Sequence, residues 1–217
     1  MAKEERKYFI TFEGIDGCGK DTQLYRLADL IKEDNNGLYG DKYSNIWLTR
    51  EPTKLTDSGK EISRLLKTDN IDADVATRYF IDDRKEHTKM IKGILGHSDV
   101  LCSRYDLSAL TYQCVQGTDL NQLYELHSYG QEHGAMIPDV TLFFDLPAEE
   151  AARRTTKRSS DREFFENLDF QKRVREKSYE VIDYLMKRDN RKIIVINSDQ
   201  SIDAVTGEMY EKLKNVL

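Results

Sequence analysis

The chain has 217 residues, a length that suits one α/β domain with a full core or one domain with a mobile insert. Charged residues make up 33% of the chain and apolar residues 39%, a balance that excludes an intrinsically disordered chain. The net charge of −6 argues against a general nucleic-acid-binding protein, because such proteins normally carry a basic excess.

The elements predicted along the chain alternate between strands and helices. In chain order they are a strand at 8–12, a helix at 21–33, a strand at 45–49, helices at 58–66 and 72–95, a strand at 99–103, helices at 108–116 and 119–133, a strand at 140–146, helices at 148–158 and 169–187, a strand at 192–196 and a terminal helix. This alternation predicts a single α/β domain over residues 1–217, with a parallel sheet of about five strands covered by helices on both faces.

A glycine-rich turn follows the first predicted strand. The residues Gly-Ile-Asp-Gly-Cys-Gly-Lys at 14–20 match the P-loop pattern up to its final position, between a strand and a helix. The glycines let backbone N–H groups face a phosphate, Lys20 adds a cation, and the helix N-terminus adds partial positive charge. We expect the nucleotide to be bound by Gly14, Asp16, Gly17, Cys18, Gly19, Lys20, Asp21 and Thr22.

The last P-loop position departs from the pattern. It is usually Ser or Thr, whose hydroxyl binds Mg²⁺, and here it is Asp21. Thr22 is a poor substitute because one helical step turns a side chain by about 100°. A carboxylate at Asp21 would bind Mg²⁺ strongly, and it would repel the phosphates in the absence of the metal.

Six short motifs, taken in order, resemble those of thymidylate kinases. They are FEGIDGCGKDTQ at 12–23, TREP at 49–52, FIDDR at 80–84, RYDLS at 104–108, YQ at 112–113 and the segment 161–175. The resemblance spans about residues 8–195. It implies Mg²⁺-dependent phosphoryl transfer from ATP to dTMP, in a P-loop NTPase-type three-layer sandwich with a helical lid at about residues 153–166.

The resemblance gives several residues a role toward the acceptor. Arg50 follows a strand and would meet the acceptor phosphate as a bidentate cation. Phe80 and Arg84 lie four residues apart on a predicted helix and share a face. The family implies that this Phe stacks on thymine and that this Arg hydrogen-bonds the edge of the base. The alternative is a core Phe and an exposed Arg.

Further roles concern the phosphate and the sugar. The resemblance implies that Arg104 binds the acceptor phosphate, that Tyr112 and Gln113 line the base and sugar, and that Asp16 accepts a hydrogen bond from the 3′-hydroxyl. Ordinary helix packing remains open for Tyr112, and a turn role remains open for Asp16.

Arg154, Arg158 and Arg162 recur at intervals of four and would form one basic stripe on a helix. A solvated charged face is the alternative. Some members of the family carry an Arg inside the P-loop, where this chain has Gly17, and the resemblance is to the subgroup in which lid arginines supply the charge. We expect Arg154 to contact the donor nucleotide. The expected catalytic cations are Lys20, Arg104, Arg158 and Arg162.

A second departure accompanies the first. The residue before Arg104 is normally Asp, near the magnesium, and here it is Ser103. We hypothesise that Asp21 and Ser103 face the same ion and have exchanged ligand types, which preserves one carboxylate and one hydroxyl. The loop after Pro52 also differs, because residues 53–55 are Thr-Lys-Leu where the family often has two glycines. That difference bears on how the acceptor phosphate is bound and on which acceptor is used.

Two other functions stay open. One is a kinase for another nucleoside monophosphate, such as dUMP, or for a nucleoside. The other is a catalytically decayed nucleotide-binding protein, which Asp21 and Ser103 favour and the lid arginines oppose.

The expected partners are the small molecules dTMP and ATP, with no nucleic acid and no membrane, and the family implies a homodimer. No apolar run approaches the ~20 residues of a membrane span, and residues 1–7 lack the apolar stretch of a secretory signal, so we expect a cytoplasmic protein. The three cysteines and four histidines show neither disulfide nor zinc-site spacing.

Overall fold

The computed structural model describes residues 6–33, 45–68, 72–132, 134–156 and 168–217. Its strands are β1 (Phe9–Glu13), β2 (Ile46–Arg50), β3 (Asp99–Ser103), β4 (Val140–Asp145) and β5 (Ile193–Asn197). They form one parallel sheet in the order β2-β3-β1-β4-β5. The predicted α/β class with a parallel sheet of about five strands is confirmed.

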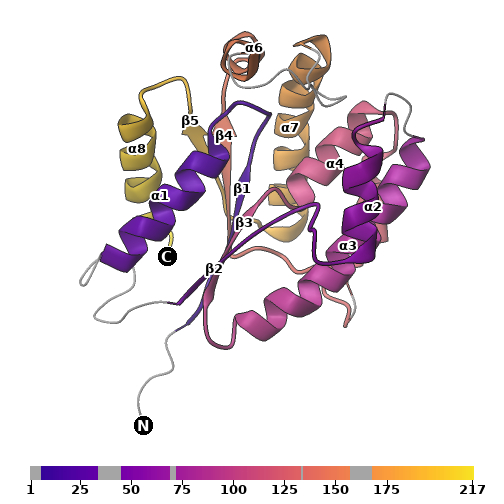
Figure 1. Ribbon diagram of the computed structural model, residues 1–217, viewed down its shortest axis with the longest axis horizontal. Coiled ribbons are helices and arrows are strands. Elements are labelled where there is room, and N and C mark those ends of the chain that lie inside the picture. The colour runs from indigo at the N-terminus through magenta and orange to yellow at the C-terminus, as the bar shows by residue number, and fades with distance from the viewer. Residues whose placement is uncertain (1–5, 34–44, 69–71, 133, 157–167) are drawn as a thin grey trace.

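Helices cover both faces of this sheet. They are α1 (Lys20–Glu33), α2 (Asp57–Leu65), α3 (Ala73–Ile94), α4 (Asp106–Val115), α5 (Leu120–His127), α6 (Ala148–Thr156), α7 (Leu168–Asp189) and α8 (Ile202–Lys214). Figure 1 shows α1 and α8 on one side of the sheet, with α3, α4 and α7 on the other. No helix in the described ranges combines the length and the apolar composition that a membrane crossing requires.

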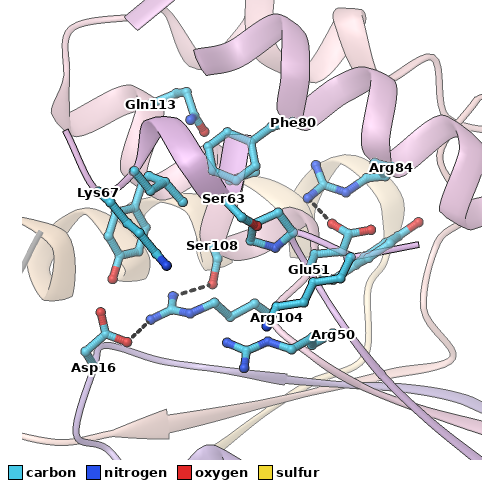
Figure 2. Close-up of a pocket in the computed structure, with 16 residues that line it drawn as sticks. Asp16, Arg50, Glu51, Ser63, Lys67, Phe80, Arg84, Arg104, Ser108 and Gln113 are labelled. Carbon is cyan, nitrogen blue, oxygen red and sulfur yellow. Dashed lines mark hydrogen bonds and ion pairs between the residues drawn. The ribbon is translucent and has the colours of Figure 1, made fainter. Parts of the chain in front are cut away.

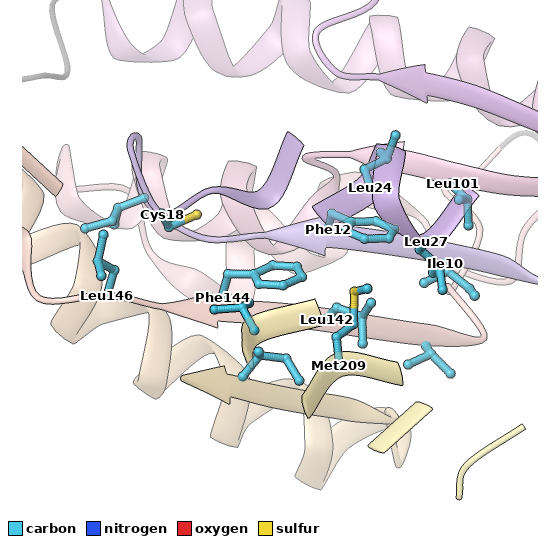
Figure 3. Close-up of a cluster of buried hydrophobic side chains, with 14 of the residues drawn as sticks. Ile10, Phe12, Cys18, Leu24, Leu27, Leu101, Leu142, Phe144, Leu146 and Met209 are labelled. Carbon is cyan, nitrogen blue, oxygen red and sulfur yellow. The ribbon is translucent and has the colours of Figure 1, made fainter. Parts of the chain in front are cut away.

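Burial on both faces explains why the strands read as continuous apolar runs. Successive side chains of a strand point to opposite faces of the sheet. Leu142 and Phe144 of β4 therefore belong to the core that includes Leu27 of α1 and Met209 of α8 (Figure 3). Phe143, between them, belongs to a second core with α4, α5 and α7. Apolar side chains of β4 therefore pack into both layers, Leu142 and Phe144 on one face and Phe143 on the other.

One predicted helix end is wrong. The helix expected at 119–133 ends at His127. Ser128 adopts the left-handed conformation, with φ 52° and ψ 44°, and Gly130 also has a positive φ of 76°. A residue in this conformation terminates a helix, and a Ser in the sequence does not predict it, because Gly or Asn is usual at such a position.

We expect Gly59→Ala to lower the free energy of unfolding by roughly 2 kcal/mol, because an added Cβ would overlap the carbonyl oxygen of Thr53 and the carboxylate of Asp83. The matched control is Gly207→Ala in α8, where nothing lies within 4 Å of the new Cβ. That change should raise the free energy of unfolding by up to about 1 kcal/mol. Urea unfolding of both variants measures the difference, and equal effects would contradict the packing at Gly59.

Candidate active site

The carboxyl ends of β1, β2 and β3 meet at one edge of the sheet. Ser103 of β3 pairs with Phe12 of β1 on one side and with Arg50 of β2 on the other. The residues that follow these three strands therefore lie close together, and they line a cavity of about 270 Å³. Ligands of open parallel sheets bind at this edge.

All of the residues predicted to bind the acceptor line this cavity. They are Asp16, Arg50, Phe80, Arg84, Arg104, Tyr112 and Gln113. In Figure 2, Phe80 and Gln113 lie at one end of the cavity, and Asp16, Arg104 and Arg50 lie at the other. One end therefore suits a planar base and the other suits an anion.

The cavity also contains residues to which the motifs assigned no role. Glu51, Ser63, Lys67 and Ser108 line it. Lys67 follows α2 and points into the cavity in Figure 2, which adds a cation to those of Arg50 and Arg104. Lys67 could not be predicted from the sequence, because the helical pattern of residues 58–66 does not show which side faces the sheet edge.

Arg104 is held in an unusual backbone conformation. Its φ of 62° lies in the left-handed region, which costs a non-glycine residue roughly 1 kcal/mol. Two contacts to β1 hold the turn: Arg104 donates its N–H to Phe12 O at 2.9 Å, and the next N–H, of Tyr105, reaches Glu13 Oε1 at 2.8 Å. The end of β1 thus sets the direction of the Arg104 side chain.

The Arg104 guanidinium contacts three side chains. It forms an ion pair with Asp16, donates to Ser108 Oγ at 3.2 Å, and lies over the Tyr112 ring at 5.3 Å. Lys20 Nζ lies 3.6 Å from the same Asp16 carboxylate. Burial alone would raise the pKa of Asp16, but the charges of Arg104 and Lys20 outweigh it and lower the pKa to about 2. Asp16 is therefore an ionised acceptor at neutral pH.

Glu13 lies beneath this arrangement and is fully buried. Its carboxylate accepts from the Ser108 hydroxyl and from the Tyr105 N–H. Burial raises the pKa of Glu13 to about 7, against the lowering effect of the Ser108 hydrogen bond. Ser108 thus connects Glu13 to Arg104, because its oxygen donates to one and accepts from the other.

The P-loop turn has no room for side chains at two of its glycines. Gly14 has a φ of +141°, and a Cβ there would lie 2.6 Å from Phe144 O. Gly17 has a φ of +85°, and a Cβ there would lie 2.7 Å from Ala151 O. Lys20, at the start of α1, is buried at 5% exposure. The turn therefore presents backbone groups and one lysine, as a phosphate site requires.

A second cavity, of about 320 Å³, adjoins the same turn. It is lined by Gly17, Cys18, Gly19 and Thr22 of the predicted nucleotide site. Arg154 of α6 lines it too, held by Glu150 at 2.8 Å and by Ser198 O at 3.2 Å. The other two predicted lid arginines, Arg158 and Arg162, lie outside the described residues.

The two positions that depart from the family pattern are in direct contact. The Ser103 hydroxyl, at the end of β3, donates to the carboxylate of Asp21 in the first turn of α1. Burial opposes the ionisation of Asp21, but Lys20 and the Ser103 hydrogen bond outweigh it and lower its pKa. One carboxylate and one hydroxyl thus lie together beside the P-loop.

Arg84 is buried at 1% exposure, so the alternative of an exposed arginine is wrong. Its guanidinium donates to Glu51, donates to His127 Nε2 at 2.6 Å, and lies over the Tyr105 ring at 4.9 Å. The neighbouring Asp83 faces the loop that follows β2. Asp83 accepts from Thr53 N–H at 2.8 Å and from the Thr56 hydroxyl.

The family model described as thymidylate kinase matches residues 12–209. A probable thymidylate kinase of Methanococcus aeolicus is 34% identical over 206 residues, covering 94% of this chain and 95% of its own. Proteins with the same name are 35% identical in Methanocaldococcus jannaschii, covering 96% of both chains, and 31% identical in Pyrococcus horikoshii, covering 98% of both.

Asp83→Asn should weaken binding at the cavity, because an amide offers only one acceptor to the two donors of the loop at 53–56. We expect the Kd for a nucleoside monophosphate to rise about tenfold, and the free energy of unfolding to fall by roughly 2 kcal/mol. Calorimetric titration and urea unfolding measure these changes. The control is Asp82→Asn, at the adjacent exposed position of α3, which should change neither quantity. Equal behaviour of the two variants would count against the loop contact.

The raised pKa of Glu13 makes stability depend on pH. An unfolded Glu has a pKa of about 4.3 and the buried Glu13 a pKa of about 7, so the native state binds the proton more tightly between these values. The contribution of Glu13 to the free energy of unfolding is therefore present at low pH, and it is lost as the pH rises through about 7. Glu13→Gln should remove this loss, which amounts to roughly 1–3 kcal/mol.

Urea unfolding at pH 5 and pH 8 tests the Glu13 prediction in wild type and variant. The control is Glu61→Gln, which removes a carboxylate from the surface pair with Arg64. If Glu13→Gln keeps the pH dependence of the wild type, another group is responsible.

Proposed function

Because the chain belongs to the thymidylate kinase family, we propose that it transfers the γ-phosphoryl group of ATP to dTMP, giving ADP and dTDP. The observation that carries this proposal is the cavity at the sheet edge, which has an aromatic end suited to a planar base and a cationic end beside the P-loop. A phosphorylated pyrimidine nucleoside has matching chemistry, with a planar base, a sugar hydroxyl and an anion.

In this proposal the acceptor lies along the cavity. Arg50 and Arg104 bind its phosphate, and Phe80 stacks on the base. The ionised Asp16 accepts a hydrogen bond from the 3′-hydroxyl, while Arg84 donates to the edge of the base. Tyr112 and Gln113 line the base and sugar. These assignments are supported by the shared cavity and by the contacts that hold Arg84 and Arg104 in place.

The donor lies across the P-loop from the acceptor. Backbone N–H groups of the Gly14–Gly19 turn and Lys20 bind its phosphates, and Arg154 contacts it in the second cavity. Phosphoryl transfer spreads negative charge over the equatorial oxygens, so catalysis consists largely of positioning and charge stabilisation. We assign that role to Lys20, Arg104, Arg158 and Arg162. The space around Gly17 supports a charge supplied by the lid, because no side chain fits there.

Asp21 and Ser103 would hold Mg²⁺ with the donor phosphates. Their contact supports this, since a carboxylate and a hydroxyl are oxygen ligands that Mg²⁺ accepts. Among the described residues, no group of three or more His, Cys, Asp or Glu could hold a metal by itself. Nucleotide-bound Mg²⁺ needs only one or two protein ligands, and when bound here it would neutralise phosphate charge.

The family resemblance also supports a homodimer and a single catalytic domain with a lid at about residues 153–166. We propose that the enzyme acts in the cytoplasm on small-molecule substrates.

We expect dTMP to lead turnover in a panel of dTMP, dUMP, dCMP, UMP, CMP, AMP and thymidine, with ADP release measured in Mg·ATP. Thymidine should be inactive because it brings no phosphate to Arg50 and Arg104. If another acceptor gave the highest turnover, the proposed phosphoryl transfer would stand and the proposed preference for dTMP would be contradicted. Folded protein that binds ATP and dTMP without any turnover would contradict catalysis.

The exchange of ligand types predicts a pattern among three variants. Asp21→Ser and Ser103→Asp should each lower kcat by roughly tenfold or more, because one leaves no carboxylate and the other places two carboxylates together. The double variant Asp21→Ser with Ser103→Asp again has one carboxylate and one hydroxyl, and it should recover most of the lost kcat. The measurement is kcat as a function of Mg²⁺ concentration. An Asp21→Ser variant more active than wild type would contradict the exchange.

A further inference from the structure

We infer that His127 is a positioning residue for acceptor selectivity. It holds the Arg84 guanidinium so that a remaining N–H of a terminal nitrogen faces a carbonyl oxygen on the acceptor base, and it thereby favours thymine or uracil over cytosine. The inference rests on the proposed function of the cavity that Arg84 lines.

Three contacts fix the plane of the Arg84 guanidinium. One terminal nitrogen donates to Glu51 and the other donates to His127 Nε2 at 2.6 Å. The guanidinium carbon lies 4.9 Å from the centre of the Tyr105 ring. A planar fork held at both terminal nitrogens has one orientation. With Glu51 alone, the group could turn about that single contact.

His127 is itself held as a hydrogen-bond acceptor. Its Nδ1–H donates to Leu123 O at 2.7 Å, which leaves the lone pair of Nε2 directed at Arg84. The ring stacks on Tyr129, with centroids 5.4 Å apart and planes 9° apart. Burial, together with the charge of Arg84, lowers the pKa of His127 to about 3, so the ring stays neutral near pH 7.

A neutral acceptor suits this position. Glu51 already supplies the negative charge that Arg84 needs in a buried setting, and it also accepts from His87 Nδ1 at 2.9 Å. A second carboxylate would place two like charges around one guanidinium. The imidazole of His127 contacts the other terminal nitrogen of Arg84, so it fixes the orientation of the guanidinium. Because the ring is neutral, it adds no charge.

The chemistry of the bases turns orientation into selectivity. Arginine offers only donors. Thymine and uracil present a carbonyl oxygen at C4, whereas cytosine presents an amino group, which also donates. A fixed Arg84 leaves two donors opposed when cytosine binds, and buried unpaired donors are costly. An Arg84 free to turn away would lower that cost, so the discrimination would fall.

Two amide variants separate the two nitrogens of His127. In His127→Asn, the short amide can still donate to Leu123 O but cannot reach Arg84. In His127→Gln, the longer amide places its oxygen near the position of Nε2 and can still accept from Arg84. Both variants are polar and neutral, which matches them for folding. The measurements are kcat/KM and Kd for dTMP, dUMP and dCMP, with thermal unfolding of each protein.

We expect His127→Asn to lower the ratio of kcat/KM for dTMP over dCMP by about tenfold, through a higher KM for dTMP and a lower KM for dCMP, with KM for ATP unchanged. His127→Gln should keep the ratio within about threefold of wild type. A control, Tyr129→Phe, removes the hydroxyl bond to Asp106 but keeps the stacked ring. It should lower thermal stability without changing the ratio.

An unchanged ratio in His127→Asn would overturn the inference, and so would equal losses in the two amide variants. Both results leave the proposed function intact if wild type prefers dTMP. A wild-type protein that binds neither dTMP nor dUMP would overturn the proposed function and this inference together.

Discussion

The candidate site depends on the hydrogen bonding of β1 between β3 and β4. This central position buries Glu13 at the end of the strand and brings it beside the turn after β3. The Glu13 carboxylate then accepts from the N–H of Tyr105, the residue after Arg104, and from the Ser108 hydroxyl, which contacts the Arg104 guanidinium. Arg104, at the cationic end of the cavity, is thus positioned by the neighbouring strand, and its left-handed backbone persists because these contacts compensate for it.

Much of the architecture could be predicted from the sequence, because short apolar runs separated by helical patterns permit few arrangements other than a covered parallel sheet. Each predicted strand overlaps an observed one. Asp16, Arg50 and Arg104 share one cavity because they lie at or just after the ends of strands that meet at the same edge, and helices α3 and α4 bring the other acceptor residues to it. The contacts of Glu13 and His127 could not be predicted. Their partners lie 92 and 43 residues away, and only the packing of layers brings them together. The roles of the site residues remain predictions.

Buried charge in this protein serves orientation more than stability. Arg84 pairs with Glu51, and Arg191 pairs with Asp106, all at 3% side-chain exposure or less. Desolvation of such pairs offsets most of their attraction, so they add little net stability. Their benefit is geometric, because a buried guanidinium with fixed partners cannot change direction. An acidic protein can therefore maintain a cationic cavity on a small set of well-held arginines.

The surroundings of Gly17 limit how this enzyme can evolve. A side chain there would meet the carbonyl oxygen of Ala151, and the backbone has a positive φ. An arginine therefore cannot be acquired at this position by a single substitution, since α6 would have to move away first. Moving α6 would displace Arg154, which lies on the same helix. Intermediates on that path would lose one source of charge before gaining the other, so descendants of this sequence should retain the glycine.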